Sequence, residues 1–415
     1  MKNYSVISLF SGAGGMDLGF KKANFKIEWA NDFDKDAVST YKKNIGDHIV
    51  LGDICNIDSD NIPNNPDVII GGFPCQGFSV ANTKRNMNDK RNFLYKEMLR
   101  VIKDKQPKIF LAENVKGLLS MENGKVLKMI KQDFENIGYK INIEVLNAAD
   151  YGVPQARERI IILGNRIDIK NIFPTKTHTN IKKQSKQLTL EDFDSNLEEN
   201  KSLKPYITTN ETIGFLKNIK ITNNPIKVDE RTIYNHIAYT NVADTFWKRK
   251  YDVNQADICD YLNYWKNKSD WSVKKIDEYL GYKYTAGHWF RKDNNSGSIP
   301  SVDDWWELKK ILNFDNKYDK YVTDLVEKEI VFEQSLRITN WNRPSDTITA
   351  TSPEIHINKK RRLSVRECAM LQTFPDEFVF EGSLNSMHRQ VGNAVPVKLA
   401  HKIADCTRQM LKAKS

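Results

Sequence analysis

The sequence YSVISLF at residues 4–10 runs directly into SGAGG at residues 11–15, and this junction decides the fold. Apolar and β-branched residues fill the first segment, which predicts a short buried strand. The glycines that follow allow a tight turn whose backbone N–H groups point at a ligand. A helical pattern then runs from Asp17 to Lys22. A strand, a glycine-rich turn and a helix in this order predict the ligand-binding corner of an α/β fold.

The alternation of strands and helices continues to about residue 170. Apolar strands are predicted at IEWAND (27–32), DVIIGGF (67–73), IFLAEN (109–114), YKINIEVLNA (139–148) and RIIILGNR (159–166), with helices over 35–44 and 94–103. This order predicts a doubly wound, mostly parallel sheet. We expect the last two strands to form an antiparallel hairpin at one edge of it.

Bulk composition indicates a globular protein with a polyanionic partner. The chain has 415 residues, of which 40% are hydrophobic and 28% charged, so two domains are expected. Its net charge of +10 favours nucleic acid as that partner. The cysteines are scattered without C-x-x-C spacing, which predicts neither a disulfide framework nor a metal site. No signal peptide or long apolar run is visible, so we expect an intracellular protein without membrane spans.

A change of composition near residue 174 marks the end of the first domain. Residues 175–204 are polar and rich in Lys, Asn and Ser, which predicts a linker or surface loop. Residues 205–385 hold most of the tryptophans and form the expected second, smaller domain. Helical periodicity returns near Asn393, so residues 386–415 are expected to pack on the first domain, residues 1–174.

One cysteine lies on a loop suited to a nucleophile. The segment GGFPCQGFS, residues 71–79, places Cys75 just after a predicted strand. Pro74 restrains the backbone before the thiol, and open α/β sheets carry their sites at the carboxyl ends of strands. The alternative is a small buried cysteine that only contributes to packing.

Two acids and an aromatic residue suggest an adenosine pocket. Asp32 ends the second strand, where a carboxylate can accept hydrogen bonds from ribose hydroxyls. Phe33 beside it would stack on adenine, and Asp53 would complete the pocket. A helix cap for Asp32 and a core contact for Phe33 are the alternatives.

An acid and two arginines are predicted at the same sheet edge. Glu113 follows the strand IFLA, while Arg157 and Arg159 precede the last strand, where alternation would direct them to one face. Taken alone, Glu113 could equally cap a helix, and the arginines could line a solvated strand edge.

Six segments now occur in a characteristic order. FSGAGGMDLGF (10–20), GGFPCQGFS (71–79), ENV (113–115), QARER (155–159), RECAMLQTFP (366–375) and RQVGNAVPVKLA (389–400) together resemble the DNA (cytosine-5) methyltransferases, in particular bacterial enzymes of restriction-modification systems. The resemblance covers residues 4–170 and 344–405. It implies a Rossmann-like, S-adenosylmethionine-dependent methyltransferase fold and methylation of carbon 5 of cytosine in duplex DNA.

The resemblance implies a role for each catalytic candidate. Carbon 5 of cytosine attacks a sulfonium methyl group only weakly unless a thiolate first adds to carbon 6, and Cys75 matches that thiolate. Glu113 matches the acid that protonates or hydrogen-bonds ring nitrogen 3. Arg159 matches the arginine that holds the cytosine carbonyl oxygen, and Arg157 matches its neighbour that steadies the site and a nearby phosphate.

The resemblance also implies cofactor and DNA contacts, and no metal. The residues expected to hold S-adenosylmethionine are Phe10, Ser11, Gly12, Gly14, Gly15, Asp32, Phe33, Asp53, Ile54, Pro74, Asn393 and Val395. The cytosine must leave the duplex stack to react, so the polar loop at 77–93 is expected to close behind it. The residues of this part expected to contact DNA are Gln76, Ser79 and Arg91.

The middle of the chain lies outside the resemblance and is expected to read the DNA sequence. SVKKIDEYLGY (272–282) is followed by TAGHWFRKD (285–293) and SIPSVDDWWELKKIL (298–312), which predicts a helix-turn-helix-like unit over 270–312. We expect His288, Arg291 and Lys292 to face the major groove. A tryptophan-rich helical core with solvated charges is the alternative.

Three other functions fit parts of this pattern. A tRNA cytosine-5 methyltransferase uses the same motif set, although the long tryptophan-rich segment favours DNA. A silent DNA-binding regulator would be expected to lack Cys75, Glu113 or Arg159, and a nicotinamide oxidoreductase is disfavoured because the glycine spacing departs from G-x-G-x-x-G. The resemblance therefore implies an enzyme that binds double-stranded DNA, and we expect it to be a monomer of the bacterial cytoplasm or nucleoid. The sequence leaves open whether a cognate restriction endonuclease exists.

Overall fold

A computed structural model describes residues 3–74, 94–180, 203–240, 255–281, 289–291, 299–326, 338–351, 353–358 and 360–414. The chain divides into two compact units. The first comprises Met1–Ile237, Trp341–Thr351 and Val365–Ser415, and the second comprises Ala238–Asn340 and Ser352–Ser364. Six of the predicted site residues lie outside the described residues, namely Cys75, Gln76, Ser79, Arg91, His288 and Lys292.

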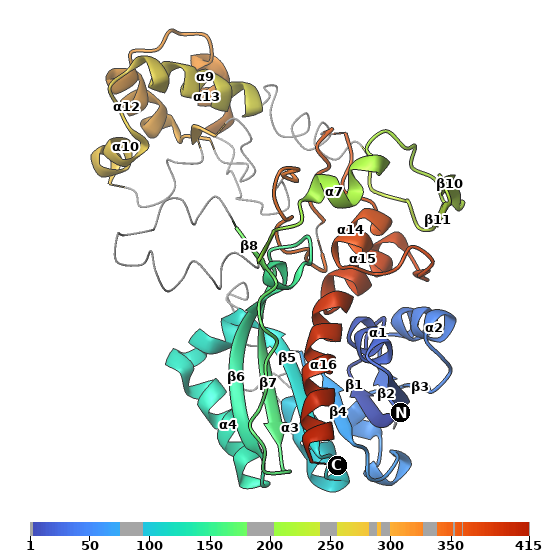
Figure 1. Ribbon diagram of the computed structural model, residues 1–415. Coiled ribbons are helices and arrows are strands. Elements are labelled where there is room, and N and C mark those ends of the chain that lie inside the picture. The colour runs from blue at the N-terminus through green and yellow to red at the C-terminus, as the bar shows by residue number, and fades with distance from the viewer. Residues whose placement is uncertain are drawn as a thin grey trace. The chain divides into compact units, whose positions relative to one another are not determined.

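A seven-stranded sheet forms the centre of the first unit (Figure 1). In the order β3-β2-β1-β4-β5-β7-β6, its strands are Ile49–Leu51, Phe25–Asp32, Tyr4–Leu9, Val68–Gly71, Ile109–Val115, Glu158–Asn165 and Lys140–Asn147. Strands β1 to β5 run parallel, whereas β7 is antiparallel to both β5 and β6. The doubly wound, mostly parallel sheet and its edge hairpin are therefore confirmed. Because the chain order reverses between β1 and β4, the loops after these two strands flank the topological switch point.

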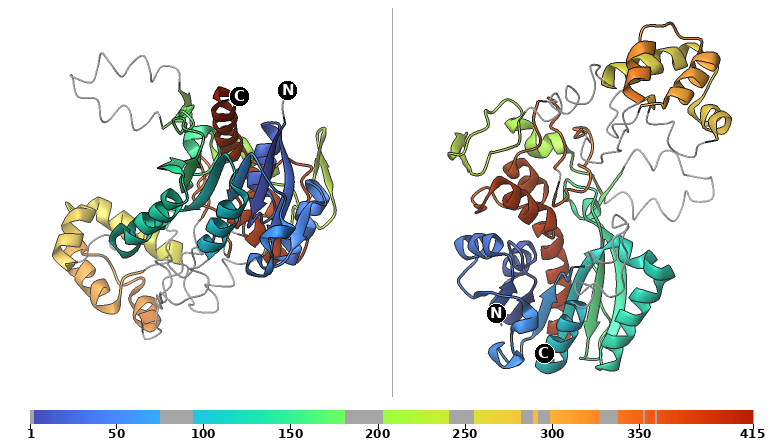
Figure 2. Two further views of the ribbon diagram at one scale, coloured as in Figure 1. Left: turned by 90° about the horizontal axis from the view of Figure 1, so that it is seen from below. Right: turned by 180° about the vertical axis from the view of Figure 1, so that it is seen from behind.

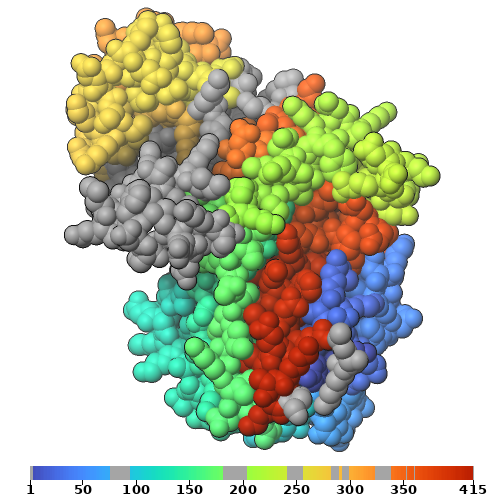
Figure 3. Space-filling model, in the orientation of Figure 1, coloured from blue at the N-terminus to red at the C-terminus, as the bar shows by residue number. Residues whose placement is uncertain are grey.

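Helices cover both faces of this sheet (Figures 1 and 2). On one face, α3 (Leu94–Lys105) and α4 (Lys125–Asn136) pack through a core that includes Met98, Phe110 and Ile130. On the other face, α1 (Gly15–Lys22) packs against α16 (Val397–Ala413), which lies along the surface in Figure 3. Helix α2 (Lys35–Asn44) has the predicted bounds because the carboxylate of Asp34 caps its first N–H groups.

Short elements complete the first unit. They are β8 (His178–Thr179), β9 (Lys204–Pro205), α7 (Thr209–Ile213), β10 (Ile226–Val228), β11 (Arg231–Ile233), α14 (Val365–Leu371), α15 (Leu384–Asn393) and the 3-10 helices η1 (Ile54–Asn56), η2 (Ser59–Asn61), η5 (Lys116–Gly124), η6 (Ala148–Tyr151) and η8 (Gly214–Leu216). The sequence places residues 205–237 and 365–385 in the recognition domain, whereas they are compact with the first unit. Buried Arg366 contributes to this packing, because it donates to the carbonyl oxygens of Tyr234 and Pro375, each at 2.8 Å.

The second unit contains a helical body with its own core. Its helices are α9 (Gln255–Lys268), α10 (Val273–Leu280), α12 (Val302–Leu312) and α13 (Asp319–Val326). Trp305 is fully buried and donates from Nε1 to Asp319 Oδ1 at 2.9 Å, while Trp289 and Phe290 fill the same core. The predicted helix-turn-helix-like unit over 270–312 includes residues 282–288 and 292–298, which lie outside the described residues, so that unit stays a prediction. The predicted tryptophan-rich core is present, and a DNA-reading role for Arg291 stays a prediction.

Candidate active site

Glu113 and Arg159 lie together at the carboxyl ends of the parallel strands, and the loop after β4 leads toward Cys75, which lies outside the described residues. Strand β4 ends at Gly71 and leads through Pro74 to Cys75, while Glu113 lies near the end of β5. Strand β7 runs in the opposite direction, so its first residues reach this same edge, where Arg159 pairs with Val115. The ends of two parallel strands and the start of an antiparallel one therefore build a single site.

Glu113 and Arg159 form an ion pair at this edge. Arg159 Nε lies 2.9 Å from Glu113 Oε1, and the two side chains are only 10–11% exposed. Burial lowers the pKa of Arg159, and the neighbouring carboxylate partly offsets that effect. The arginine stays cationic because its ordinary pKa is so high. The pair therefore holds the carboxylate of Glu113 in a fixed direction.

The loop that leads to Cys75 runs against this carboxylate. A Cβ atom on Gly72 would lie 3.2 Å from Glu113 Oε2, so a larger residue here would require the carboxylate to shift by a few tenths of an ångström. Asn114 Nδ2 donates to the carbonyl oxygen of Phe73 at 3.0 Å and fixes the loop from the other side. The sequence analysis missed Asn114, although it lies inside the ENV motif.

Arg157 has a different environment from Arg159. Its side chain is buried, and its two terminal nitrogens donate to the carbonyl oxygens of Ile348 and Gly392, each at 3.0 Å. Gln155 reinforces this connection, because its Oε1 accepts the N–H of Ile348 at 3.0 Å. Arg157 therefore ties the start of β7 to two distant segments, and its expected effect on a nearby DNA phosphate stays a prediction.

The loop after β1 has the backbone conformation of a ligand cradle. Phe10, Gly12 and Gly14 have positive φ angles of 53°, 55° and 87°. A Cβ atom on Gly12 would meet no atom within 4 Å, so open space lies in front of this residue. A Cβ atom on Gly15 would lie 2.5 Å from the carbonyl oxygen of Val395, so these two predicted pocket residues are in close contact.

Asp32 and Phe33 have the arrangement expected of a nucleoside site. Asp32 Oδ2 accepts the N–H of Gly12 at 2.7 Å, and its Oδ1 accepts the N–H of Asp34 at 2.8 Å. Burial raises the pKa of Asp32, against the effect of these hydrogen bonds. Phe33 is 73% exposed, which excludes core packing and leaves its ring free to stack on a planar ligand. The helix cap considered for Asp32 is provided by Asp34 instead.

For the other predicted cofactor residues, the structure gives contacts within the chain only. Ser11 Oγ donates to Ser8 Oγ at 3.0 Å. Asp53 is exposed and caps η1 through the N–H of Cys55 at 3.0 Å, with Ile54 buried behind it. Asn393 is the exposed last residue of α15. Contacts of these residues with a cofactor stay predictions.

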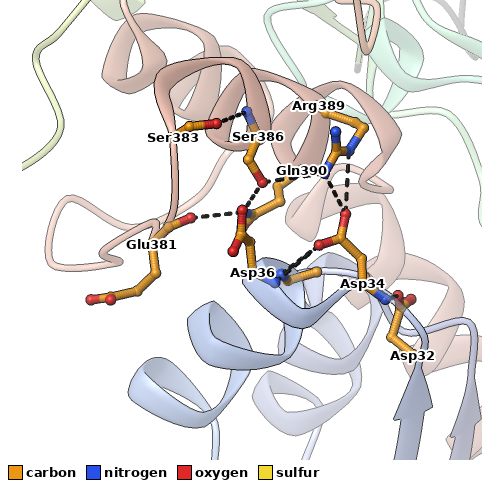
Figure 4. Close-up of polar contacts among 10 residues, drawn as sticks. Asp32, Asp34, Asp36, Glu381, Ser383, Ser386, Arg389 and Gln390 are labelled. Atoms are coloured by element: carbon orange, nitrogen blue, oxygen red, sulfur yellow. Dashed lines mark hydrogen bonds and ion pairs between the residues drawn. The ribbon is translucent and has the colours of Figure 1, made fainter. Parts of the chain in front are cut away.

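Two further residues that the sequence analysis missed support the turn at Asp32 (Figure 4). Asp34 Oδ2 accepts hydrogen bonds from Arg389 Nη2 at 2.7 Å and Nε at 3.2 Å. An acid before a helical run is a recognisable cap signal, so Asp34 was open to prediction. Arg389 lies 355 residues further along the chain, and no local pattern connects the two.

Two searches over the described part of the chain were negative. No helix there is both long and apolar enough to cross a membrane. Within the same residues, no group of three or more His, Cys, Asp or Glu side chains is arranged to hold a metal ion.

The mostly parallel sheet carries a glycine-rich loop, the carboxylate of Asp32 and the Glu113–Arg159 ion pair at the carboxyl ends of its strands. This arrangement is that of the Rossmann-like methyltransferases. Comparison with known proteins gives the family. Residues 4–408 match C-5 cytosine-specific DNA methylases, and the chain belongs to this family.

Several relatives from bacteria are similar to almost the whole chain. Type II methyltransferase M.NgoFVII of Neisseria gonorrhoeae is 33% identical, over 96% of this chain and 86% of that protein. M.FnuDI of Fusobacterium nucleatum is also 33% identical, over 99% and 95%. Among solved structures, a DNA modification methyltransferase encoded within an Escherichia coli prophage has the same fold, with a TM-score of 0.57, 23% identity and coverage of 99% and 100%.

Proposed function

We propose that this DNA (cytosine-5) methyltransferase moves a methyl group from S-adenosylmethionine to a cytosine flipped out of duplex DNA, and that it protects DNA from a cognate restriction endonuclease. The observation that carries the proposal is the Glu113–Arg159 pair, held against the loop that leads to Cys75. Full-length similarity to Type II methyltransferases supports duplex DNA over tRNA as the substrate.

The residues at the switch point fit S-adenosylmethionine. The exposed ring of Phe33 suits the adenine, the carboxylate of Asp32 suits the ribose hydroxyls, and the open space at Gly12 admits a ligand close to the backbone. Both oxygens of Asp32 already accept backbone N–H groups, which orients their remaining lone pairs. The bound cofactor supplies an electrophilic methyl group on a sulfonium centre.

Cys75 begins the reaction on the base. Its thiolate forms a bond to carbon 6, and the electron pair of the 5,6 double bond moves into the ring, where a proton or hydrogen bond from Glu113 at nitrogen 3 takes up the charge. Carbon 5 would then use its electron pair to bond the methyl carbon, while the bond from that methyl group to the cofactor sulfur breaks and its electron pair stays on sulfur, so that a neutral thioether leaves. Loss of the carbon 5 proton to a base restores the double bond and breaks the bond to sulfur, which frees Cys75.

Arg159 is placed to hold the cytosine during these steps. Its Nε lies 2.9 Å from Glu113 Oε1 in an ion pair, and its Nη1 donates to the carbonyl oxygen of Glu158 at 2.8 Å, so both contacts restrain the guanidinium group. Its other N–H groups can donate to the cytosine carbonyl oxygen as charge develops there. Arg157 positions the start of β7 and does not contact the base.

DNA contacts are proposed outside this pocket. Gln76 or Ser79 would fill the space that the flipped base leaves, and Arg91 would contact a phosphate. In the second unit, exposed Arg291 follows the buried pair Trp289–Phe290, so a rigid core supports its backbone. Arg291, with His288 and Lys292, is proposed to read the target sequence.

A methylation assay tests the proposal. The full chain is incubated with tritium-labelled S-adenosylmethionine and either duplex DNA or tRNA, and incorporation is expected only into DNA. Cys75→Ser should abolish incorporation while calorimetry still detects cofactor binding, because Cys75 acts on the base. Methylation by the serine variant at a rate near that of the parent would contradict the assignment of the nucleophile, and incorporation into tRNA alone would contradict the substrate.

A further inference from the structure

The amino end of α2 is joined to α15 by charged contacts (Figure 4). The carboxylate of Asp34 makes two kinds of contact, a helix cap and an ion pair. Its Oδ1 caps α2 by accepting the N–H groups of Asp36 and Ala37 at 3.0 and 3.3 Å, and its Oδ2 accepts both hydrogen bonds from Arg389. The backbone of the same residue donates to Asp32 Oδ1. Arg389 is therefore linked to the proposed ribose-binding carboxylate through one intervening residue.

This link is not needed to dock the segment before α15 onto α2. Thr40 Oγ1 accepts the N–H of Glu381 at 2.8 Å, and the side-chain amide of Asn44 bonds both the N–H and the carbonyl oxygen of Val379 at 2.8 Å. Lys43 adds an ion pair with Glu381. Contacts along α2 thus hold α2 and the segment before α15 together. The Asp34–Arg389 pair lies apart from them, at the amino end of α2, next to Asp32.

The charge of Asp34 is favoured by its surroundings. Partial burial raises its pKa, but Arg389 and the two N–H donors outweigh that effect and bring the pKa below its usual value. The side chain of Asp34 is 20% exposed and that of Arg389 45% exposed. An ion pair with two hydrogen bonds to one oxygen restricts the direction of the carboxylate, and therefore of the turn that carries Phe33.

We propose that Arg389 and Asp34 are positioning residues for the cofactor site, which hold the Asp32–Phe33 turn in the conformation that binds the nucleoside. This inference rests on the proposed use of S-adenosylmethionine. Neither side chain needs to touch the cofactor. Arg389 acts through Asp34, and Asp34 acts through its N–H bond to Asp32.

Three variants of the full chain test this arrangement: Arg389→Gln, Asp34→Asn and the double variant. Asparagine is as good a helix cap as aspartate, so Asp34→Asn removes the charge while the cap is retained. For a partly exposed pair, each single variant should raise the Kd for S-adenosylmethionine about three- to fivefold. The double variant should be no weaker than either single one, because the interaction can be lost only once. KM for the cofactor should rise with kcat nearly unchanged.

Lys43→Gln is the matched control. It breaks the other ion pair between α2 and the same segment, at the far end of the helix from Asp32, and should leave cofactor affinity unchanged. Equal weakening in Lys43→Gln would show that only docking matters and would overturn the inference. Unchanged affinity in Arg389→Gln, or additive effects in the double variant, would also overturn it. If the parent chain itself fails to bind S-adenosylmethionine, the proposed function fails instead.

Discussion

At the scale of single residues, Asp17 shows how burial changes a carboxyl group beside the cofactor loop. It lies fully buried in the first turn of α1, and its Oδ1 accepts a hydrogen bond from the hydroxyl of Tyr41 at 2.9 Å. Burial raises the pKa of Asp17 to about 6, against hydrogen bonds from Ser8 and Tyr41. The folded chain therefore holds a proton on Asp17 at pH values where the unfolded chain has released it.

This difference predicts a pH dependence of stability. Because the pKa of Asp17 is raised on folding, the contribution of Asp17 to the free energy of unfolding should fall as the pH rises from about 4 to about 6, and then stay level. Asp17→Asn keeps an oxygen for Tyr41 and cannot ionise, so it should flatten this decline and stabilise the protein at pH 8 by on the order of 2 kcal/mol. Urea denaturation across this pH range measures both effects. An unchanged slope in the variant would argue against the burial effect.

Single residues also show what sequence could and could not predict. Glu113, Asp32 and Phe33 follow predicted strands, so their place at one sheet edge follows from the alternation of elements. Arg157 carries no comparable signal. Its neighbours Ile348 and Gly392 lie 191 and 235 residues away, and only the folded chain reveals that this arginine is buried.

At the scale of elements, the contact between α1 and α16 depends on a residue without a side chain. A Cβ atom on Gly19 would lie 2.4 Å from Ala400 Cβ and 2.7 Å from the backbone nitrogen of His401. Neither atom belongs to a flexible side chain that could move aside. The two helices therefore approach each other as closely as their backbones allow.

Gly19→Ala should destabilise the protein although alanine is the better helix former. Helix propensity would contribute about 1 kcal/mol in favour of alanine. Overpacking typically costs about 1–3 kcal/mol, and contacts this short place the site at the upper end of that range. A lower midpoint of thermal unfolding is expected. Gly117→Ala is the control, since its nearest neighbour would be Val115 Cγ2 at 4.0 Å. A Gly19→Ala midpoint equal to the control would contradict the packing argument.

Helices and strands differ in how well the sequence predicts them. Helix α2 and the β6-β7 hairpin were predictable because the periodicity of a helix and the apolar runs of two successive strands are local signals. The sequence did not predict in the same way that residues 205–237 belong to the first unit. Their packing with the first unit depends on contacts such as that of Tyr234 with Arg366, which lie 132 residues apart.

At the scale of the whole molecule, the net charge of +10 predicts salt-dependent binding of DNA. Lysine and arginine contacts to phosphates release counterions, so affinity for duplex DNA should fall by at least about tenfold between roughly 50 and 200 mM salt. Binding of S-adenosylmethionine should change little over the same range, which makes it the internal control. Fluorescence anisotropy with labelled DNA measures the first quantity and calorimetry the second. A DNA affinity independent of salt would exclude phosphate contacts as its main source.

The packing of α16 on α1 also has a consequence for synthesis on the ribosome. The glycine cradle at residues 10–15 is made well before its neighbour Val395 and before α16, which covers α1, because these come almost 400 residues later in the chain. A nascent chain therefore carries Cys75 and Glu113 long before the cradle is complete. Methylation activity is expected to begin only after α16 has left the exit tunnel.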